Sequence, residues 1–139
     1  MTKFLLDTST ISLAIRRGPD ERVLKQLREH GGNCAMASVT WHELRFGVGR
    51  LPRGQRQREL ADFLEEVVLP TIPALPYDER AATWHADERV RLEKLGKTPP
   101  FIDGQIAAVA LTNGLPVVTA NPKDFKTFKG VSVLNWASK

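Results

Sequence analysis

Short apolar segments alternate with amphipathic segments along most of the chain. The apolar segments predict buried strands, and the amphipathic ones, with apolar side chains three or four residues apart, predict helices. The expected strands cover residues 2–6, 34–37, 71–72, 116–119 and 131–134. The expected helices cover residues 11–17, 20–30, a stretch that includes 43–48, then 55–68, 78–95 and 102–111. This alternation is typical of an α/β sandwich with a central, mostly parallel sheet.

Size and composition limit the class of protein. The chain has 139 residues, 42% of them hydrophobic, so we expect one domain over residues 1–139. In the helix at 78–95 we expect a buried stripe made by Ala81, Trp84, Leu92 and Leu95. No apolar run is long enough to cross a bilayer, and the N-terminus lacks the features of a signal peptide, which predicts a cytoplasmic protein without a membrane span. The net charge of +4 suits a polyanionic partner without identifying one.

Three acidic residues stand close to the predicted junctions between strands and helices. Asp7 directly follows the first strand, Glu43 lies in the helix after the second strand, and Asp103 opens the helix at 102–111. Taken singly, each has a structural explanation. Asp7 is a favoured N-cap, Glu43 and Thr40 match a capping box, and Asp103 complements a helix dipole. Together, however, the three are expected to meet at one edge of the sheet, where ligands of parallel sheets bind.

A carboxylate cluster of this kind favours a hard cation. Two unit charges about 4 Å apart repel by about 4 kcal/mol at an effective dielectric constant near 20, which a metal ion relieves. Magnesium prefers carboxylate oxygens and completes its shell with water and phosphate oxygens. The cluster of Asp7, Glu43 and Asp103 therefore predicts metal-dependent hydrolysis of a phosphodiester.

Other polar and aromatic residues near these junctions have open or structural interpretations. Asn121 is either a metal ligand through its amide oxygen or a turn residue before Pro122, and Ser9 either holds a carboxylate or caps a helix. His42 is interpreted as structural, because adjacent residues on a helix point about 100° apart and Glu43 takes the site. We expect core or interface positions for Trp41, Phe46 and Trp84, and solvated positions for Arg16, Arg17, Arg50, Arg53, Lys123 and Lys126.

Four segments resemble the PIN-domain family, and VapC-type toxins in particular. They are FLLDTS at 4–9, SVTWHEL at 38–44, DGQIAA at 103–108 and VTANPKDF at 118–125, and together they span essentially the whole chain. Many PIN domains carry a fourth acid where this chain has Asn121, so the resemblance leaves the number of metals open. Asp124 is a nearby acid and the second choice for that position.

The resemblance implies a fold, an activity and partners. The fold would be a PIN-like α/β/α sandwich, and the activity a magnesium-dependent endoribonuclease, with manganese as a substitute. Asp7, Glu43 and Asp103 would hold the metal, with Asn121 as a conditional fourth ligand. The substrate would be a structured RNA, with tRNA among the candidates. The partners would be a VapB-like antitoxin and a second copy of the toxin.

Two alternatives remain at this stage. The first is a PIN-like RNA-binding or interaction module whose acids only cap helices. The second is a phosphatase similar to the haloacid dehalogenases, whose first motif places a second acid two residues after the nucleophile. Ser9 occupies that position here, which disfavours the phosphatase.

Overall fold

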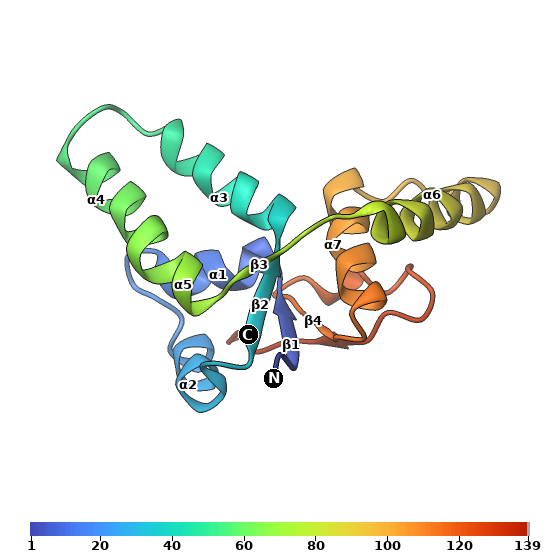
Figure 1. Ribbon diagram of the computed structural model, residues 1–139, viewed down its shortest axis with the longest axis horizontal. Helices are drawn as coiled ribbons and strands as arrows, with labels where there is room; N and C mark the ends of the chain where they lie inside the picture. The colour runs from blue at the N-terminus through green and yellow to red at the C-terminus, as the bar shows by residue number, and fades with distance from the viewer. Residues whose placement is uncertain (139) are drawn as a thin grey trace.

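The computed structural model describes residues 1–138, and its centre is a five-stranded parallel sheet (Figure 1). Leu5 in the middle strand pairs with Ala35 on one side and with Val117 on the other. All four neighbouring pairs of strands are parallel, which confirms the predicted sheet. From one edge to the other, the strands are β3 (Ala74–Leu75), β2 (Cys34–Ala37), β1 (Phe4–Leu6), β4 (Val117–Val118) and β5 (Val133–Leu134).

Helices cover both faces of the sheet. One face carries the helices that precede β3, namely α1 (Thr8–Ile15), α2 (Glu21–His30), α3 (Ser38–Gly49), α4 (Gln55–Phe63), the π-helical turn η1 (Leu64–Val68) and α5 (Leu69–Thr71). The other face carries α6 (Glu79–Lys94) and α7 (Phe101–Thr112). A short 3-10 helix, η2 (Pro122–Asp124), follows β4. The three layers confirm the α/β/α sandwich.

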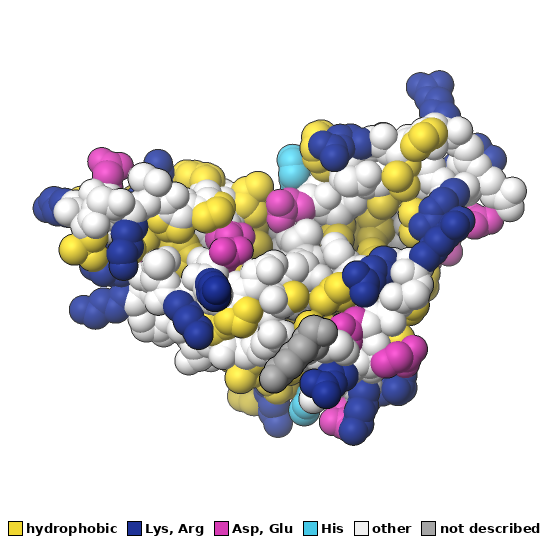
Figure 2. Space-filling model, turned by 180° about the vertical axis from the view of Figure 1, so that it is seen from behind, with side chains coloured by type: hydrophobic (Ala, Val, Ile, Leu, Met, Phe, Trp, Pro, Cys, Tyr) yellow, Lys and Arg dark blue, Asp and Glu magenta, His cyan; other side chains and the backbone are white. Residues whose placement is uncertain are grey.

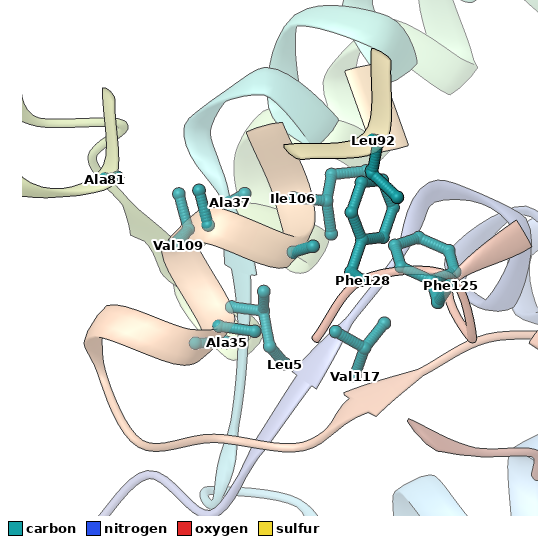
Figure 3. Packing of buried hydrophobic residues seen from close by; sticks show 13 residues of the cluster. Leu5, Ala35, Ala37, Ala81, Leu92, Ile106, Val109, Val117, Phe125 and Phe128 are labelled. Carbon is teal, nitrogen blue, oxygen red and sulfur yellow. The ribbon is translucent and has the colours of Figure 1, made fainter. Parts of the chain in front are cut away.

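Alternating side chains along the strands divide the core between the two faces. Leu5 and Val117 pack with α7 and with Phe125 and Phe128, as Figure 3 shows. The next residue of each strand, such as Leu6 after Leu5, packs against α1 to η1 on the opposite face. Because side chains alternate along a strand, a sheet covered on both faces needs continuous apolar strands, as the sequence has.

Two expectations about the elements are wrong. The strand predicted at 71–72 is absent, because a helical hydrogen bond from the Ile72 amide to the Val68 carbonyl, 2.8 Å long, carries the helix past this point. The strand forms three residues later as β3, where the Pro73 carbonyl accepts a hydrogen bond from the Met36 amide. Proline lacks a donor but keeps its acceptor, so it can begin a strand.

The buried stripe of α6 also differs from the expected one. Ala81 and Leu92 are buried, but Leu95 is 58% exposed, because α6 ends at Lys94 and the chain turns away. His85 and Glu88 take buried places in the stripe instead. Among residues 1–138, no helix combines the length and the apolar character that a bilayer span requires.

Candidate active site

Asp7 lies at the carboxyl end of the middle strand and is only 5% exposed. Its Oδ1 accepts hydrogen bonds from the Thr10 amide (2.9 Å) and from the Ser9 hydroxyl (2.8 Å). The first bond makes Asp7 the N-cap of α1, as its structural explanation predicts. Both bonds end on Oδ1, so the cap leaves Oδ2 without a hydrogen bond from any residue between 1 and 138.

Glu43 lies in the second turn of α3, and the capping box expected there does not form. The helix begins at Ser38, with Ala37 at the N-cap and no side-chain cap. Glu43 instead accepts a hydrogen bond of 2.5 Å from the hydroxyl of Thr8, at the start of α1. The same hydroxyl contacts Thr40 at 3.3 Å. Glu43 is therefore tied to the residue next to Asp7, and its structural explanation fails.

Asp103 lies in the first turn of α7, on the opposite face of the sheet from α3. Burial, followed by repulsion from Asp124, Asp7 and Glu43, raises the pKa of this carboxyl to about 6. No side chain caps the start of α7, and no described side chain donates a hydrogen bond to Asp103. The three predicted acids therefore lie close enough to interact electrostatically, and this interaction helps to raise the pKa of Asp103.

A cleft lies between α3 and α7. It has a volume of about 420 Å³ and is lined by Ser38, Val39, His42, Ile102 and Gln105. Two of the lining residues, His42 and Ile102, are the immediate neighbours of Glu43 and Asp103 in the sequence. Figure 2 shows a notch between two lobes of the molecule, with acidic side chains at its base.

Hydroxyl groups connect the end of β4 to the edge of the sheet where Asp7 lies. Besides donating to Asp7, the Ser9 hydroxyl accepts a hydrogen bond of 3.1 Å from the Ala120 amide. The Thr119 hydroxyl accepts one of 2.9 Å from the Asn121 amide. Ser9 therefore holds a carboxylate, one of its two expected roles, and joins the end of β4 to Asp7.

Asn121 and Asp124 occupy the turn after β4. The Asn121 carbonyl accepts a hydrogen bond from the Asp124 amide at 3.1 Å, so Asn121 serves as a turn residue, and its side chain is exposed. Asp124 acts on the pKa of Asp103 more strongly than Asp7 or Glu43 does. The sequence favours Asn121 over Asp124 as a fourth metal ligand. In the structure, Asp124 has the larger electrostatic effect on Asp103.

The donor set fits a hard divalent cation. Asp7 and Glu43 each use one carboxylate oxygen for local hydrogen bonds, and Asp103 uses neither with any side chain between residues 1 and 138. In that range no three acidic, histidine or cysteine side chains are close enough to form a preassembled metal shell. Metal binding therefore requires these side chains to change position, which the free oxygens permit. The raised pKa of Asp103 shows that the fold disfavours its negative charge, which a bound cation would neutralise.

Two aromatic residues near the site are exposed. His42 lines the cleft on α3, and its structural role stays a prediction. Phe46 is 58% exposed and lies outside the core, so only the interface position expected for it stays a prediction. Helical spacing alone does not reveal which side of α3 the rest of the chain covers, so the sequence carried no signal for this exposure. Trp41 is half-buried against the core, as expected.

Comparison with known proteins gives a consistent result. The model of the PIN domain family matches residues 4–131. The chain is 32% identical over 134 residues to the VapC ribonuclease Y4jK of Sinorhizobium fredii, covering 94% of this chain and 95% of that protein. It is 36% identical over 124 residues to the toxin FitB of Neisseria gonorrhoeae, covering 87% and 89%.

Solved structures show the same likeness. The crystal structure of FitAcB from Neisseria gonorrhoeae superposes with a TM-score of 0.87 at 35% identity, covering 95% of this chain and 96% of that one. DNA-bound VapBC from Salmonella typhimurium superposes with a TM-score of 0.86 at 28% identity, covering 99% and 100%.

Proposed function

The chain belongs to the PIN-domain family and is an endoribonuclease of the VapC toxin type, and we propose that Asp7, Glu43 and Asp103 form its catalytic centre. The observation that carries this proposal is the approach of three carboxylates from different elements. One follows β1, one lies on α3 and one on α7, and two of them raise the pKa of the third. A capping role accounts for Asp7 alone and for neither of the others.

The cofactor is a divalent cation, as is general in this family. We propose Mg²⁺, with Mn²⁺ as a substitute, because carboxylate oxygens are hard ligands. Asp7, Glu43 and Asp103 would hold it. A fourth position is open to Asn121 through its amide oxygen or to Asp124 through its carboxylate, and this choice decides whether a second ion binds.

The residues of the chain orient the reaction. A cation held by Asp7, Glu43 and Asp103 would supply an activated water for attack on the phosphodiester and charge to stabilise the leaving oxygen. Ser9 and the Thr10 amide fix Asp7 Oδ1, so the other oxygen of Asp7 points in a defined direction. Thr8 does the same for Glu43. Asp103 has no such partner among the described side chains, and we propose that it changes position most when a cation binds.

The partners follow from the same family. A VapB-like antitoxin binds the chain, because the similar solved structures are toxin–antitoxin complexes. We propose a homodimer as well.

The substrate is RNA, and two relatives are tRNA(fMet)-specific endonucleases, so a structured RNA such as tRNA is our proposal here. We place the reaction in the cytoplasm, where such RNA is found. The single domain proposed for residues 1–139 includes Lys139, which lies outside the described residues.

Replacing one acid tests the catalytic centre. Asp7→Asn keeps an N-cap residue and a hydrogen-bond acceptor, so the fold should survive. Cleavage of cellular RNA by the antitoxin-free protein with Mg²⁺ should fall by about three orders of magnitude, because several kcal/mol of transition-state stabilisation is lost. Asp87→Asn, at an exposed position on α6, is the matched control and should cleave normally.

The outcomes separate the alternatives. If Asp7→Asn cleaves RNA and binds Mn²⁺ as the natural protein does, Asp7 only caps α1 and the proposed catalytic centre is wrong. If the natural protein itself cleaves no RNA with Mg²⁺ or Mn²⁺, the chain is a non-catalytic module. Acid-stable phosphate on Asp7 would point to the phosphatase instead, an alternative that the family match leaves without support.

A further inference from the structure

An exposed row of flat side chains runs along α3, away from the acids. His42, Phe46 and Arg50 are four residues apart, so they lie on one side of the helix. The rings of His42 and Phe46 are nearly parallel, with an interplanar angle of 22° and centroids 6.4 Å apart. The guanidinium carbon of Arg50 lies 5.1 Å from the centroid of the Phe46 ring. We call these three residues the α3 row.

The α3 row begins at the candidate active site. His42 lines the cleft between α3 and α7, and the next residue along the chain is Glu43. Eight residues of helix rise by roughly 12 Å, so the row leads from the cleft out to the end of α3. Across the cleft stands Gln105, whose side-chain amide makes no hydrogen bond with residues 1–138 and offers both a donor and an acceptor.

The row is exposed although one of its members, Phe46, is a side chain that proteins usually bury. All three residues are exposed, and Phe46 reaches 58%. Within residues 1–138, the only aromatic or cationic side chains stacked on Phe46 are the other two members of the row. A ring left open to solvent on a helix that carries a catalytic acid is a surface available to the substrate.

We propose that the α3 row is a stacking platform for unpaired bases of the RNA strand that enters the cleft. Proteins that recognise single-stranded RNA stack its bases on aromatic rings and on arginine guanidinium planes. Arg50 adds a positive charge for the phosphates at the far end of the row. The amide of Gln105 is placed to hydrogen-bond the edge of the base nearest the acids. This inference rests on the proposed ribonuclease function.

The first test measures RNA binding without cleavage. A short, fluorescently labelled single-stranded RNA oligonucleotide is titrated with the antitoxin-free protein in EDTA. Phe46→Leu, which keeps an apolar side chain but removes the ring, should weaken binding on the order of tenfold. Arg50→Gln should weaken it by a smaller factor, and Phe46→Trp should retain it. The matched controls on α4, Phe63→Leu and Arg56→Gln, should bind as the natural protein does.

The second test asks whether Phe46 contacts a base. Abasic nucleotides are placed in the oligonucleotide one position at a time. At one position, removal of the base should weaken binding to the natural protein about as much as Phe46→Leu does, and should have little further effect on Phe46→Leu. With cleavable RNA and Mg²⁺, Phe46→Leu should raise KM more than it lowers kcat.

Several results would overturn the stacking platform. One is equal sensitivity of both proteins to every abasic position. Another is an altered oligomeric state or antitoxin affinity in Phe46→Leu with RNA binding unchanged, which would assign the row to a protein interface. In either case RNA cleavage by the natural protein would still support the catalytic centre. Absence of that cleavage would reject the ribonuclease function itself.

Discussion

The two helices that form the walls of the cleft are held very differently. α7 carries six buried residues, Gly104, Ile106, Ala107, Ala108, Val109 and Ala110, and packs along α6 and the sheet. α3 buries only Thr40 and Leu44, and it extends with α4 away from the sheet (Figure 1). One acid of the proposed catalytic centre, Asp103, therefore lies on a tightly packed helix, and another, Glu43, lies on a helix with a large exposed surface. The contrast suggests that α7 positions the chemistry, while α3 also has surface available for recognition.

The largest expected effect tests whether both walls take part in the chemistry. Asp103→Asn and Glu43→Gln should each reduce the single-turnover cleavage rate with Mg²⁺ by about three orders of magnitude, because each removes a proposed metal ligand. Glu66→Gln, at an exposed position in η1, is the control. If Glu43→Gln cleaves within tenfold of the natural rate, α3 takes no part in the chemistry and contributes to recognition alone.

Glycine substitutions should show the difference in packing directly. A Cβ at Gly104 would overlap Nε2 of His85 and lie 2.7 Å from Cδ2 of the same ring. The ring itself is buried and its Nδ1 is within 3.1 Å of the Tyr77 hydroxyl, so it has little room to move. Gly104→Ala should lower the free energy of unfolding by about 1–3 kcal/mol.

The matched substitution on α3 should have the opposite sign. Gly47 has no atom within 4 Å of its added Cβ, so Gly47→Ala should raise the free energy of unfolding by roughly 0.5–1 kcal/mol through helix propensity. Urea denaturation measures both effects. Adding His85→Ala to Gly104→Ala should recover part of the loss, and a neutral Gly104→Ala would show that α7 is less constrained than its contacts indicate.

This pair of helices also shows how far the sequence predicts the structure. Both helices, the parallel sheet between them and the approach of Asp7, Glu43 and Asp103 to one edge follow from apolar periodicity and from the shared edge of parallel strands, whereas the order of the strands does not. The close contact of Gly104 with His85 does not, because it depends on how α6 packs on α7, and neither residue signals it. The exposure of His42 and Phe46 likewise depends on how far α3 extends beyond its neighbours.

The pH dependence of stability tests whether the charge of Asp103, on α7, destabilises the fold. Burial and Asp124 raise the pKa of Asp103 to about 6 from 3.8, so folding opposes its ionisation. In EDTA, the free energy of unfolding of the natural protein should therefore fall, relative to Asp103→Asn, as the pH rises from about 4 to above 6. At pH 7 Asp103→Asn should be more stable by about 1–2 kcal/mol.

Magnesium should reverse that order, because the cation binds the folded natural protein and not the variant. Thermal or urea denaturation at several pH values, with EDTA and with Mg²⁺, gives all four curves. Parallel pH curves for the two proteins in EDTA would show that Asp103 ionises as freely in the fold as in the unfolded chain.

The smallest effect concerns the segment that follows η2. Glu88, buried on α6, accepts two hydrogen bonds of 2.7 Å from Arg91 and a third of 2.7 Å from the Lys129 amide, which fastens the segment after η2. These contacts, Arg91 first, hold the pKa of Glu88 below its usual value of 4.5. Glu88→Gln should lower the free energy of unfolding by about 1 kcal/mol at pH 7, because part of the hydrogen bonding survives.

The sign of the shift fixes how this loss depends on pH. A depressed pKa stabilises the fold above pH 4.5, and that contribution disappears as the pH falls through the lower pKa of the folded state. The difference between the natural protein and Glu88→Gln should therefore shrink in acid, whereas Glu93→Gln, exposed on the same helix, should match the natural protein throughout. A cleavage rate that falls with Glu88→Gln, at a temperature where it stays folded, would mean that catalysis depends on the segment after η2. An unchanged rate would restrict the proposed catalytic residues to the end of β1, α3 and α7.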